Sequence, residues 1–281
     1  MNIVVQQSDP FATASDALIV PVGRVDGAPD FDVIALPALR DQLASLVSDA
    51  DFTGKTGSTL LVQTMGLAAP RRLILTGVGD LDALTAESIR KAWGTAVTTA
   101  RDAGAESVIS LLPPASGDLS AAAALTQATA AADMATYRFT NYQGTVKNAK
   151  PVKEIDTLAF ATDGQSADLA AALETGRAIA AAVSLARDLT NEPGSDLPPM
   201  AFAAAAEQVA ADHGLEITVY DAAALQEMGA NAILAVGKGV PILLHDPHRL
   251  PTGRRLGIDA IDRSGRQMHH LRHRRLFHQT R

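Results

Sequence analysis

Short runs of apolar or β-branched residues recur along the first 162 residues and predict strands. They lie at residues 2–7, 17–22, 59–64, 72–79, 107–112 and 157–162. Gly, Pro or Asp residues bound these runs, which is typical of buried or half-buried strands. This part of the chain is therefore predicted to build a sheet.

Helical patterns separate several of these runs, and the clearest covers residues 85–101. Its apolar side chains recur at helical spacing and form one face. Thr85 stands where its side chain caps the first turn, and Gly104 follows as a terminator. Strands that alternate with helices are typical of a sheet covered by helices on its faces. We therefore predict an α/β fold with a mixed sheet.

From Asp168 the pattern changes to a longer helix. Its apolar side chains fall within one stripe about 120° wide, from Leu169 to Val183, while Leu185 and Leu189 point the other way. We therefore predict that the C-terminal end of this helix is buried on two sides. A proline-rich turn follows it.

Four elements are predicted after this turn: a helix at about 200–213, a strand at 216–220, a helix at 222–229 and a strand at 232–236. This order predicts the start of a second α/β domain. No internal repeat is present.

Composition narrows the class of protein. The 281 residues are 47% hydrophobic and 20% charged, which is ordinary for a soluble globular protein. The chain has no cysteine, which excludes disulfides, cysteine nucleophiles and thiolate metal sites. No uninterrupted apolar run approaches the roughly 18 residues that a membrane span needs, and the N-terminus does not resemble a signal peptide. We therefore expect a cytoplasmic protein.

Charge divides the chain abruptly. Residues 1–239 carry 15 Lys and Arg against 28 Asp and Glu, whereas residues 240–281 carry nine Arg and three Asp. Six of the seven histidines also lie after Val240. The last 42 residues therefore differ in composition from everything before them.

Three interpretations of this tail compete. Metal-ligand spacings are present among His245, Asp246, His248, His269, His270 and His273. The arginines would suit non-specific phosphate binding. We favour a third interpretation, in which the tail is not a selected sequence: a changed reading frame in a GC-rich gene yields Arg, Pro, Gly and His without amphipathic period. On this interpretation the tail is disordered.

Five blocks of sequence, in order and spacing, resemble one family. They are "DFTGKTGSTLLV" (51–62), "RRLILTGVGDLDALTAESIRKAWGTA" (71–96), "YRFTNY" (137–142), "ARDLTNEPGSDLPP" (186–199) and "EMGANAILAVGKG" (227–239). The family is the leucyl (cytosol) aminopeptidases, peptidase M17, whose members use two divalent metal ions, Zn or Mn. Several blocks that agree in order are more specific than any single motif.

The resemblance implies four parts. Residues 1–160 correspond to a macro-like N-terminal domain, 161–190 to a connector helix, and 191–239 to the truncated start of the catalytic domain; 240–281 are the Arg/His-rich, atypical tail. The turn near Pro198 then leads into the catalytic domain. Pro198 stands where the family often has a threonine cap, so the next helix is expected to begin without a side-chain cap.

The family's chemistry lies beyond this point, in "GKG…FD…GG" and "NTDAEGR" stretches that are missing here. Lys238 resembles the metal-site lysine, but its surroundings align with an earlier strand, so it is not assigned that role. We assign no catalytic, metal or cofactor-binding residue and no cofactor. The resemblance implies a truncated or frameshifted leucyl aminopeptidase that is inactive alone. The alternative is a non-catalytic assembly or regulatory macro-like module.

Weaker signals are interpreted as structural. Gly77 and Gly79 suggest half of a phosphate loop, but a tight strand-to-helix turn fits them better. His213 ends a helix, where it suits the helix dipole.

Arg187 and Asp188 are adjacent on a helix, so they diverge by about 100° and are interpreted as separate anchors rather than an acid/base pair. Asn191 is interpreted as a turn former. Peptides are the family's substrates but are not expected to be turned over here. Residual homo-oligomerisation stays open, and neither a membrane nor nucleic acid is an expected partner.

Overall fold

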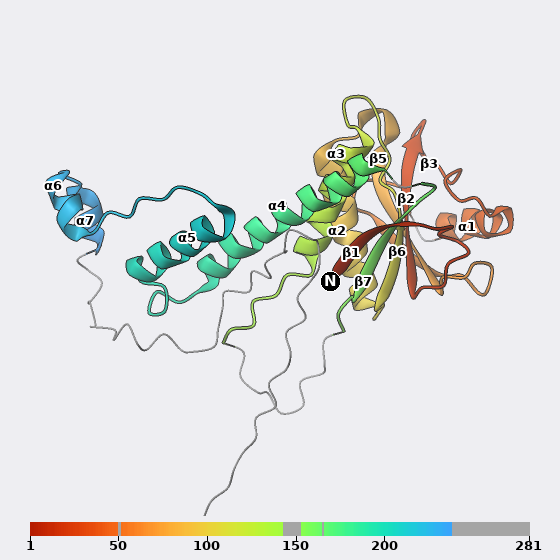
Figure 1. Ribbon diagram of the computed structural model, residues 1–281. Helices are drawn as coiled ribbons and strands as arrows, with labels where there is room; N and C mark the ends of the chain where they lie inside the picture. The colour runs from red at the N-terminus through yellow and green to blue at the C-terminus, as the bar shows by residue number, and fades with distance from the viewer. Residues whose placement is uncertain (50–51, 143–152, 165, 238–281) are drawn as a thin grey trace, which may run out of the picture. The chain divides into compact units, whose positions relative to one another are not determined.

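The computed structural model describes residues 1–49, 52–142, 153–164 and 166–237 (Figure 1). The chain divides into two compact units, Met1–Ser184 (unit 1) and Leu185–Arg281 (unit 2). Lys238 and the predicted tail at 240–281 lie outside the described residues. The predicted domain boundaries at 160, 190 and 239 stay predictions.

Unit 1 contains a seven-stranded mixed sheet, as the sequence predicts. The strands are β1 (Asn2–Gln7), β2 (Ala17–Val25), β3 (Ala28–Pro29), β4 (Thr59–Gln63), β5 (Arg72–Asp80), β6 (Ser107–Leu111) and β7 (Thr157–Thr162). Their order is β1-β7-β6-β2-β5-β4, and β3 pairs with β2. Along this order, the pairs β1–β7, β7–β6, β6–β2 and β2–β5 are parallel. The pair β5–β4 is antiparallel. All six predicted strands are confirmed; the short β3 was not predicted.

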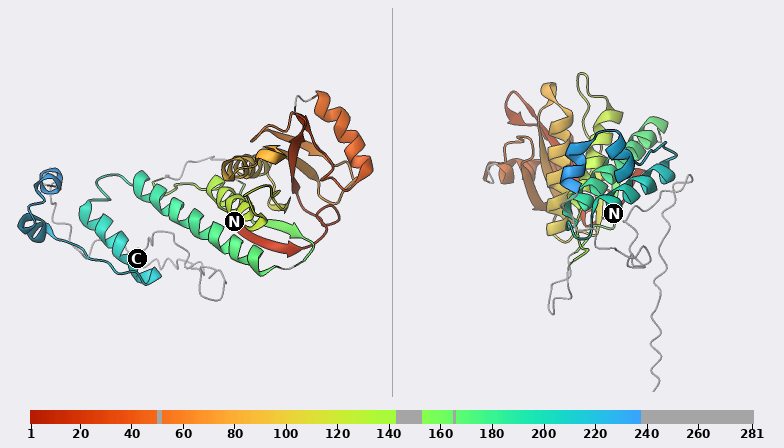
Figure 2. Two further views of the ribbon diagram at one scale, coloured as in Figure 1. Left: turned by 90° about the horizontal axis from the view of Figure 1, so that it is seen from above. Right: turned by 90° about the vertical axis from the view of Figure 1, so that its left-hand side faces the viewer.

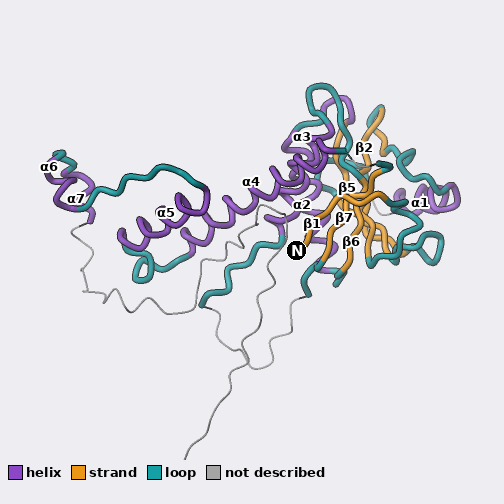
Figure 3. Tube along the Cα trace, viewed as in Figure 1, coloured by secondary structure: helices purple, strands orange, loops and turns teal. Residues whose placement is uncertain are grey.

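Helices cover both faces of this sheet. They are α1 (Pro37–Asp49), α2 (Ala86–Asp102), α3 (Ala121–Ala135) and the first part of α4 (Ala167–Asn191), and a 3-10 turn (Leu81–Ala83) precedes α2. Figure 3 and the left view of Figure 2 show the strands between α1 on one side and α2 and α3 on the other. The sequence predicted helices between several strands but gave bounds only for α2, so α1 and α3 were not located individually.

Two apolar clusters hold the layers together. Alternation along β2 places Leu18 and Val20 in the cluster beneath α1, and Ile19 in the cluster beneath α2 and α3. In the cluster beneath α2 and α3, the fully buried Trp93 donates its indole N–H to the Ser110 hydroxyl at 3.1 Å. Burial of apolar surface on both faces is therefore the main stabilisation of unit 1.

The predicted helix at 85–101 is confirmed as α2, together with its cap. The Thr85 hydroxyl accepts from the Ser88 N–H at 3.1 Å, and the Ser88 hydroxyl accepts from the Thr85 N–H at 3.0 Å. This reciprocal pair satisfies two N–H groups at the start of the helix. After the helix, Gly104 has a φ of +74°, a conformation that favours glycine.

The predicted helix from Asp168 is confirmed as α4, and its first part packs closely on α3. A Cβ atom on Gly176 would lie 2.7 Å from the Thr126 carbonyl oxygen, so only glycine fits there. The Thr126 hydroxyl donates to the carbonyl of Ala172 at 3.1 Å. Within the apolar stripe of α4, Ala172, Leu173, Gly176 and Ala180 are buried, whereas Ile179 is exposed.

The C-terminal end of α4 is less buried than predicted. Leu185 and Leu189 are both half-buried. By length and composition alone α4 also satisfies the criteria for a membrane span, with a mean hydropathy of 1.4, although the sequence contains no long uninterrupted apolar run. Core helices of soluble proteins pass the same test. In this helix Ala172, Leu173, Gly176 and Ala180 are buried, and 28% of the apolar window is buried.

The regular elements in the described part of unit 2 are all helices. They are α5 (Pro199–His213), α6 (Ala222–Glu227) and α7 (Asn231–Gly237). The predicted helices at 200–213 and 222–229 are confirmed. Pro198 precedes α5 without a side-chain cap, as predicted, and Gly214 ends it in a left-handed conformation.

Both strands predicted in unit 2 are wrong. Residues 216–220 form neither strand nor helix, and the run predicted as a strand at 232–236 lies in α7. A strand needs a neighbouring strand for its backbone hydrogen bonds, and none pairs with either run among the described residues. A helix satisfies its own backbone, and a short apolar run does not distinguish the two structures.

Asp16 joins the amino ends of β2 and β6. Its carboxylate accepts hydrogen bonds from the Ser107 N–H at 3.0 Å, the Glu106 N–H at 3.1 Å and the Ser107 hydroxyl at 3.0 Å. The Ser107 N–H is the largest cause that lowers the pKa of Asp16 below its usual value, although burial opposes the shift. The folded state therefore favours the ionised carboxylate.

Replacing Asp16 by alanine is expected to lower the free energy of unfolding by about 2 kcal/mol at pH 7, because hydrogen bonds to charged groups contribute roughly 1.5–3 kcal/mol. The folded pKa is lowered, so this contribution is present above the unfolded pKa of about 3.9 and is lost as the pH falls through the folded value. Urea denaturation of the unaltered protein and of Asp16→Ala checks this. The difference between their free energies of unfolding should be smaller at pH 3 than at pH 7. Asp41→Ala, at an exposed position of α1, is the control and should change stability by less than about 0.5 kcal/mol. A difference that stays constant with pH would contradict the assignment.

Candidate functional site

The carboxyl edge of the sheet is the first place to look for a ligand site, because open α/β sheets bind ligands there. In unit 1, the last residues of β2 there include Gly23 and Arg24, and those of the neighbouring β5 include Gly77 and Gly79. The loop at 53–58, within the first family-like block, lies against the end of β5. These three segments form the candidate site.

The glycines of β5 are bound to this loop through their backbones. Gly77 donates its N–H to the Ser58 carbonyl at 2.8 Å, and Gly79 donates to the Gly54 carbonyl at 3.1 Å. A Cβ on Gly77 would lie 2.2 Å from the Lys55 carbonyl oxygen. Because both amides are already bonded to the loop, they do not offer a phosphate cradle. The predicted strand-to-helix turn at Gly77 and Gly79 is wrong in its place: both glycines lie within β5, and the 3-10 turn Leu81–Ala83 follows the strand.

Side chains fill the rest of this edge. A Cβ on Gly23 would lie 2.2 Å from a methyl group of Leu81, and Arg24 pairs with Asp80 at 3.5 Å. The Thr56 hydroxyl donates to the Val78 carbonyl at 3.2 Å. The edge between β2 and β5 is therefore closed by packing rather than open for a ligand.

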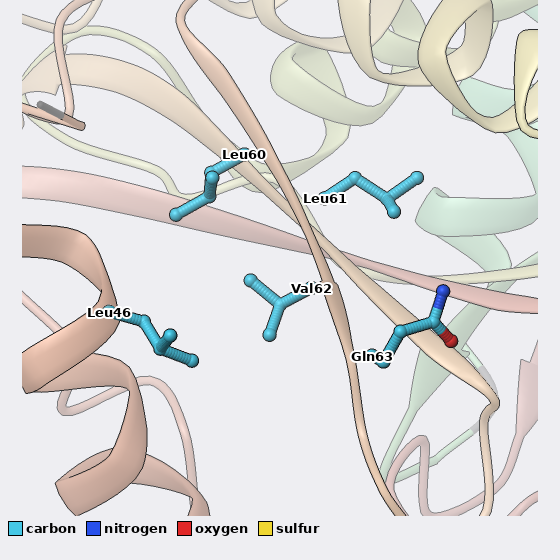
Figure 4. Close-up of a pocket in the computed structure, with 5 residues that line it drawn as sticks. All are labelled: Leu46, Leu60, Leu61, Val62 and Gln63. Carbon is cyan, nitrogen blue, oxygen red and sulfur yellow. The ribbon is translucent and has the colours of Figure 1, made fainter. Parts of the chain in front are cut away.

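Two shallow hollows lie elsewhere on unit 1. The first, of about 320 Å³, is lined by Leu46 of α1 and residues 60–63 of β4. Figure 4 shows Leu60 and Val62 turned toward Leu46, while Leu61 points away. The second, of about 360 Å³, is lined by residues 63–66 and 68–71. The first lining has no ionisable group and the second has only Arg71, so neither hollow presents an acid/base pair.

One half-buried carboxyl of unit 1 has a shifted pKa. Burial raises the pKa of Asp133 on α3, and the positive charges of the Met1 amine and Arg177 oppose the shift. Arg177 also donates to the carbonyl of Ile3 and pairs with Glu174 at 2.7 Å. This charged group joins α3, α4 and β1, and Asp133 lines neither hollow. We therefore interpret it as structural.

The other residues weighed from the sequence are spread over unit 2. Arg187 and Asp188 lie in the last turns of α4, and Asn191 is its final residue, immediately before the predicted turn. His213 lies in the last turn of α5, as predicted. The role of Arg187 and Asp188 as separate anchors stays a prediction.

The donor set of the described residues does not fit a metal centre. A metal ion needs several His, Asp or Glu side chains at short range, and no group of three or more lies close together in the described ranges. His213 is the only histidine there. No chemical step through a metal is therefore derived from these residues.

Two sequence models of one family match the chain. The N-terminal domain of the cytosol aminopeptidase family matches residues 26–145, and the catalytic domain of the same family matches residues 184–249. The second match continues through the first ten residues of the predicted tail. The five blocks noted above are thus joined by similarity over most of the chain.

Curated relatives agree with these matches. The chain is 34% identical over 263 residues to "Probable cytosol aminopeptidase" of Geobacter sp. (strain M21), covering 94% of this chain and 52% of the relative. It is 31% identical to the protein of that name in Roseiflexus castenholzii, and the similarity covers 85% of this chain and 46% of the relative. The chain therefore spans about half the length of the curated relatives it matches.

Solved structures have the same fold. The bottromycin maturation enzyme BotP in complex with Mn is 25% identical, with a TM-score of 0.61 over 81% of this chain and 43% of that one. A tomato leucine aminopeptidase is 20% identical, with a TM-score of 0.65; the similarity covers 82% of this chain and 46% of that one. The α/β fold predicted for the first part of the chain, a mixed sheet covered by helices, is confirmed, and the chain belongs to the cytosol aminopeptidase family.

Proposed function

We propose that this chain supplies the N-terminal domain and the start of the catalytic domain of a metal-dependent aminopeptidase, which releases N-terminal amino acids from peptides. In this proposal the 281-residue chain is inactive alone. One observation carries it: the catalytic-domain match begins at residue 184, yet the described residues from there to 237 bring no three metal-ligating side chains together. The proposal thus places the Zn or Mn ions of the family outside these residues.

The purified chain is expected to show no aminopeptidase turnover. Paired metal ions need bridging carboxylates to lie about 3.5–4 Å apart and to generate hydroxide, and the described residues do not gather such a set. The assay uses manganese or zinc with a leucine amide or anilide substrate, after host peptidases are removed. A second arm deletes residues 240–281, whose histidines would otherwise bind stray metal. Metal-dependent turnover that persists in this arm would refute the proposal.

We also propose that the tail arises from a changed reading frame, which would make the chain a truncated or frameshifted leucyl aminopeptidase. The abrupt gain of Arg and His after residue 239 supports this. Translation of the downstream DNA in all three frames tests it. The expected result is "FD…GG" and "NTDAEGR" stretches in another frame, and their absence from every frame would contradict it.

A second candidate is a non-catalytic assembly or regulatory module. It is favoured by the observation that both apolar clusters lie entirely within unit 1, which gives that unit its own core. A tight complex that forms through unit 1 alone would support this role. In either case we propose a cytoplasmic protein, in line with the names of its relatives, with neither a membrane nor nucleic acid as partner.

A further inference from the structure

The two edges of the sheet in unit 1 differ in what meets their outer backbone groups. β1 forms one edge and β4 forms the other. At the β1 edge, Arg177 of α4 donates to the carbonyl of Ile3. A side chain of the same chain thus reaches the outer side of β1.

The outer side of β4 has no such contact among the described residues. Thr64, which follows the strand, donates its N–H to the Arg71 carbonyl at 3.1 Å, on the side of β5. Backbone groups alternate in direction along an antiparallel strand, so those of Thr59, Leu61 and Gln63 point outward. Within the part of the chain that the structure describes, no backbone hydrogen bond joins these three residues to a segment beyond β5.

β4 also lacks the features with which edge strands avoid pairing. Its sequence, Thr-Leu-Leu-Val-Gln, contains no charged residue and no proline. Its register with β5 is continuous over all five residues, without a bulge. Natural proteins place charges, proline or bulges on exposed edge strands, because a bare edge recruits another strand. The edge of β4 is therefore suited to the addition of a strand.

Apolar side chains lie beside this edge, on the face of the sheet that α1 covers. Leu60 and Val62 turn toward Leu46 of α1 and line the hollow of about 320 Å³ (Figure 4). Leu46 is 45% exposed. Gln63 lines both hollows, and the second also includes the exposed Met65. A strand added at this edge would cover apolar surface as well as backbone groups.

Charge and symmetry favour a second copy of the chain as the occupant. The strand is uncharged, so two copies bring no like charges together along it. Antiparallel pairing about a two-fold axis at Leu61 places Thr59 of each copy opposite Gln63 of the other, and every outward backbone group of the strand gains a partner. The same register places Leu60 opposite Val62 on the α1 face. The strand is therefore complementary to itself.

We propose that β4 pairs antiparallel with β4 of a second copy, centred on Leu61, so that the two sheets continue through the interface of a homodimer. The side chains of Leu46, Leu60 and Val62 from both copies then cover the hollow beside α1. The inference goes beyond the proposed function and does not depend on it, because these residues all lie in unit 1.

Sedimentation velocity of the 281-residue chain, over a range of concentrations, measures the association. The unaltered chain should change from monomer to dimer as its concentration rises. Over the same range, hydrogen exchange should slow at the amides of Thr59, Leu61 and Gln63, because strand pairing protects them. Unit 2 also exposes apolar side chains, so variants in unit 1 are needed to assign the contact to β4.

Gln63→Pro tests the backbone contact. It removes an outward N–H, and edge strands accept proline where the N–H faces solvent. The symmetric dimer would lose two hydrogen bonds, so its dissociation constant should rise at least tenfold. Gln7→Pro is the matched control at the end of β1. Because Ser8 donates its N–H to the Thr162 carbonyl at 3.3 Å, the Gln7 N–H points outward at the opposite edge, and its loss should leave the dissociation constant unchanged.

Leu46→Asp tests the apolar contact. It should also raise the dissociation constant at least tenfold, because a charge would enter the covered hollow from each copy. Val25→Asp, at an exposed position at the end of β2, is the control and should have no effect on association. Circular dichroism shows whether each variant is folded, and the two test variants are independent of each other.

Several results would overturn the inference. They are a monomer at every concentration, a dimer that a folded Gln63→Pro or Leu46→Asp leaves unchanged, or equal weakening by the controls. A dimer in which the β4 amides exchange as fast as in the monomer would place the contact elsewhere. A chain that stays monomeric, but whose β4 amides an added uncharged Leu/Val-rich pentapeptide protects, would make an extended peptide the occupant.

Discussion

Trp93→Ala is expected to lower the free energy of unfolding of unit 1 by about 3–5 kcal/mol, as large-to-small changes of buried aromatic residues do. Trp93 is fully buried at the centre of the apolar cluster beneath α2 and α3. Its ring centroid lies 6.5 Å from that of Phe160 on β7, and its N–H donates to Ser110 on β6. The substitution would therefore leave a cavity between α2 and the sheet and remove the hydrogen bond that the Ser110 hydroxyl accepts, while that hydroxyl still donates to the Leu111 carbonyl at 2.7 Å.

Urea denaturation followed by circular dichroism measures this effect without relying on tryptophan fluorescence, since Trp93 is the only tryptophan. Trp93→Phe separates the two causes, because it keeps most of the volume and loses only the hydrogen bond. It should cost about 1–2 kcal/mol. Phe202→Ala, at an exposed aromatic position, should change the stability of unit 1 by less than about 0.5 kcal/mol. A loss below about 1 kcal/mol for Trp93→Ala would contradict the packing described.

Gly77→Val is expected to destabilise unit 1 by roughly 4 kcal/mol or to prevent its folding, since overpacking and lost backbone bonds add. A Cβ at Gly77 would lie 2.2 Å from the Lys55 carbonyl oxygen and 2.6 Å from the Gly54 carbonyl carbon. These are backbone atoms, so the loop at 53–58 must move away. The hydrogen bonds that Gly77 exchanges with Gly57 and Ser58 would then be lost.

The control for this substitution is Gly94→Ala in the middle of α2. A Cβ there would meet nothing within 4 Å, and alanine is favoured over glycine in a helix by about 1 kcal/mol. Thermal unfolding should therefore show a lower midpoint for Gly77→Val and a slightly higher one for Gly94→Ala. Equal midpoints for Gly77→Val and the unaltered protein would show that the loop does not lie against β5 as described.

The strands of unit 1 were predictable because each apolar run is short and bounded by turn residues. Helix α1 was missed although Leu39, Leu43 and Val47 recur four residues apart and all are buried, a signal that the sequence does contain. Helix α3 is different: its alanine-rich run from 121 to 135 has no polar face to mark a period. Only the Ser120 cap at its start was a local signal.

The errors in unit 2 have one physical cause. Residues 216–220 and 232–236 have strand-like sequences, but a strand forms only where another strand completes its hydrogen bonds. A single segment carries no information about that partner. At the candidate site the same limit applied, because the contact between Gly77 and residues 54–58 joins segments about 20 residues apart. The sequence predicted a strand-to-helix turn at Gly77 and Gly79, whereas both lie within β5 and bond to the loop at 53–58.

Titration of manganese into the purified 281-residue chain, followed by calorimetry and paired with the leucine anilide assay, tests the central claim most directly. A parallel titration of the chain without residues 240–281 separates binding by the histidine-rich tail from binding by a built centre. The account predicts that this shortened chain binds no pair of manganese ions and shows no turnover. Two ions bound per shortened chain, with turnover that depends on them, would contradict it.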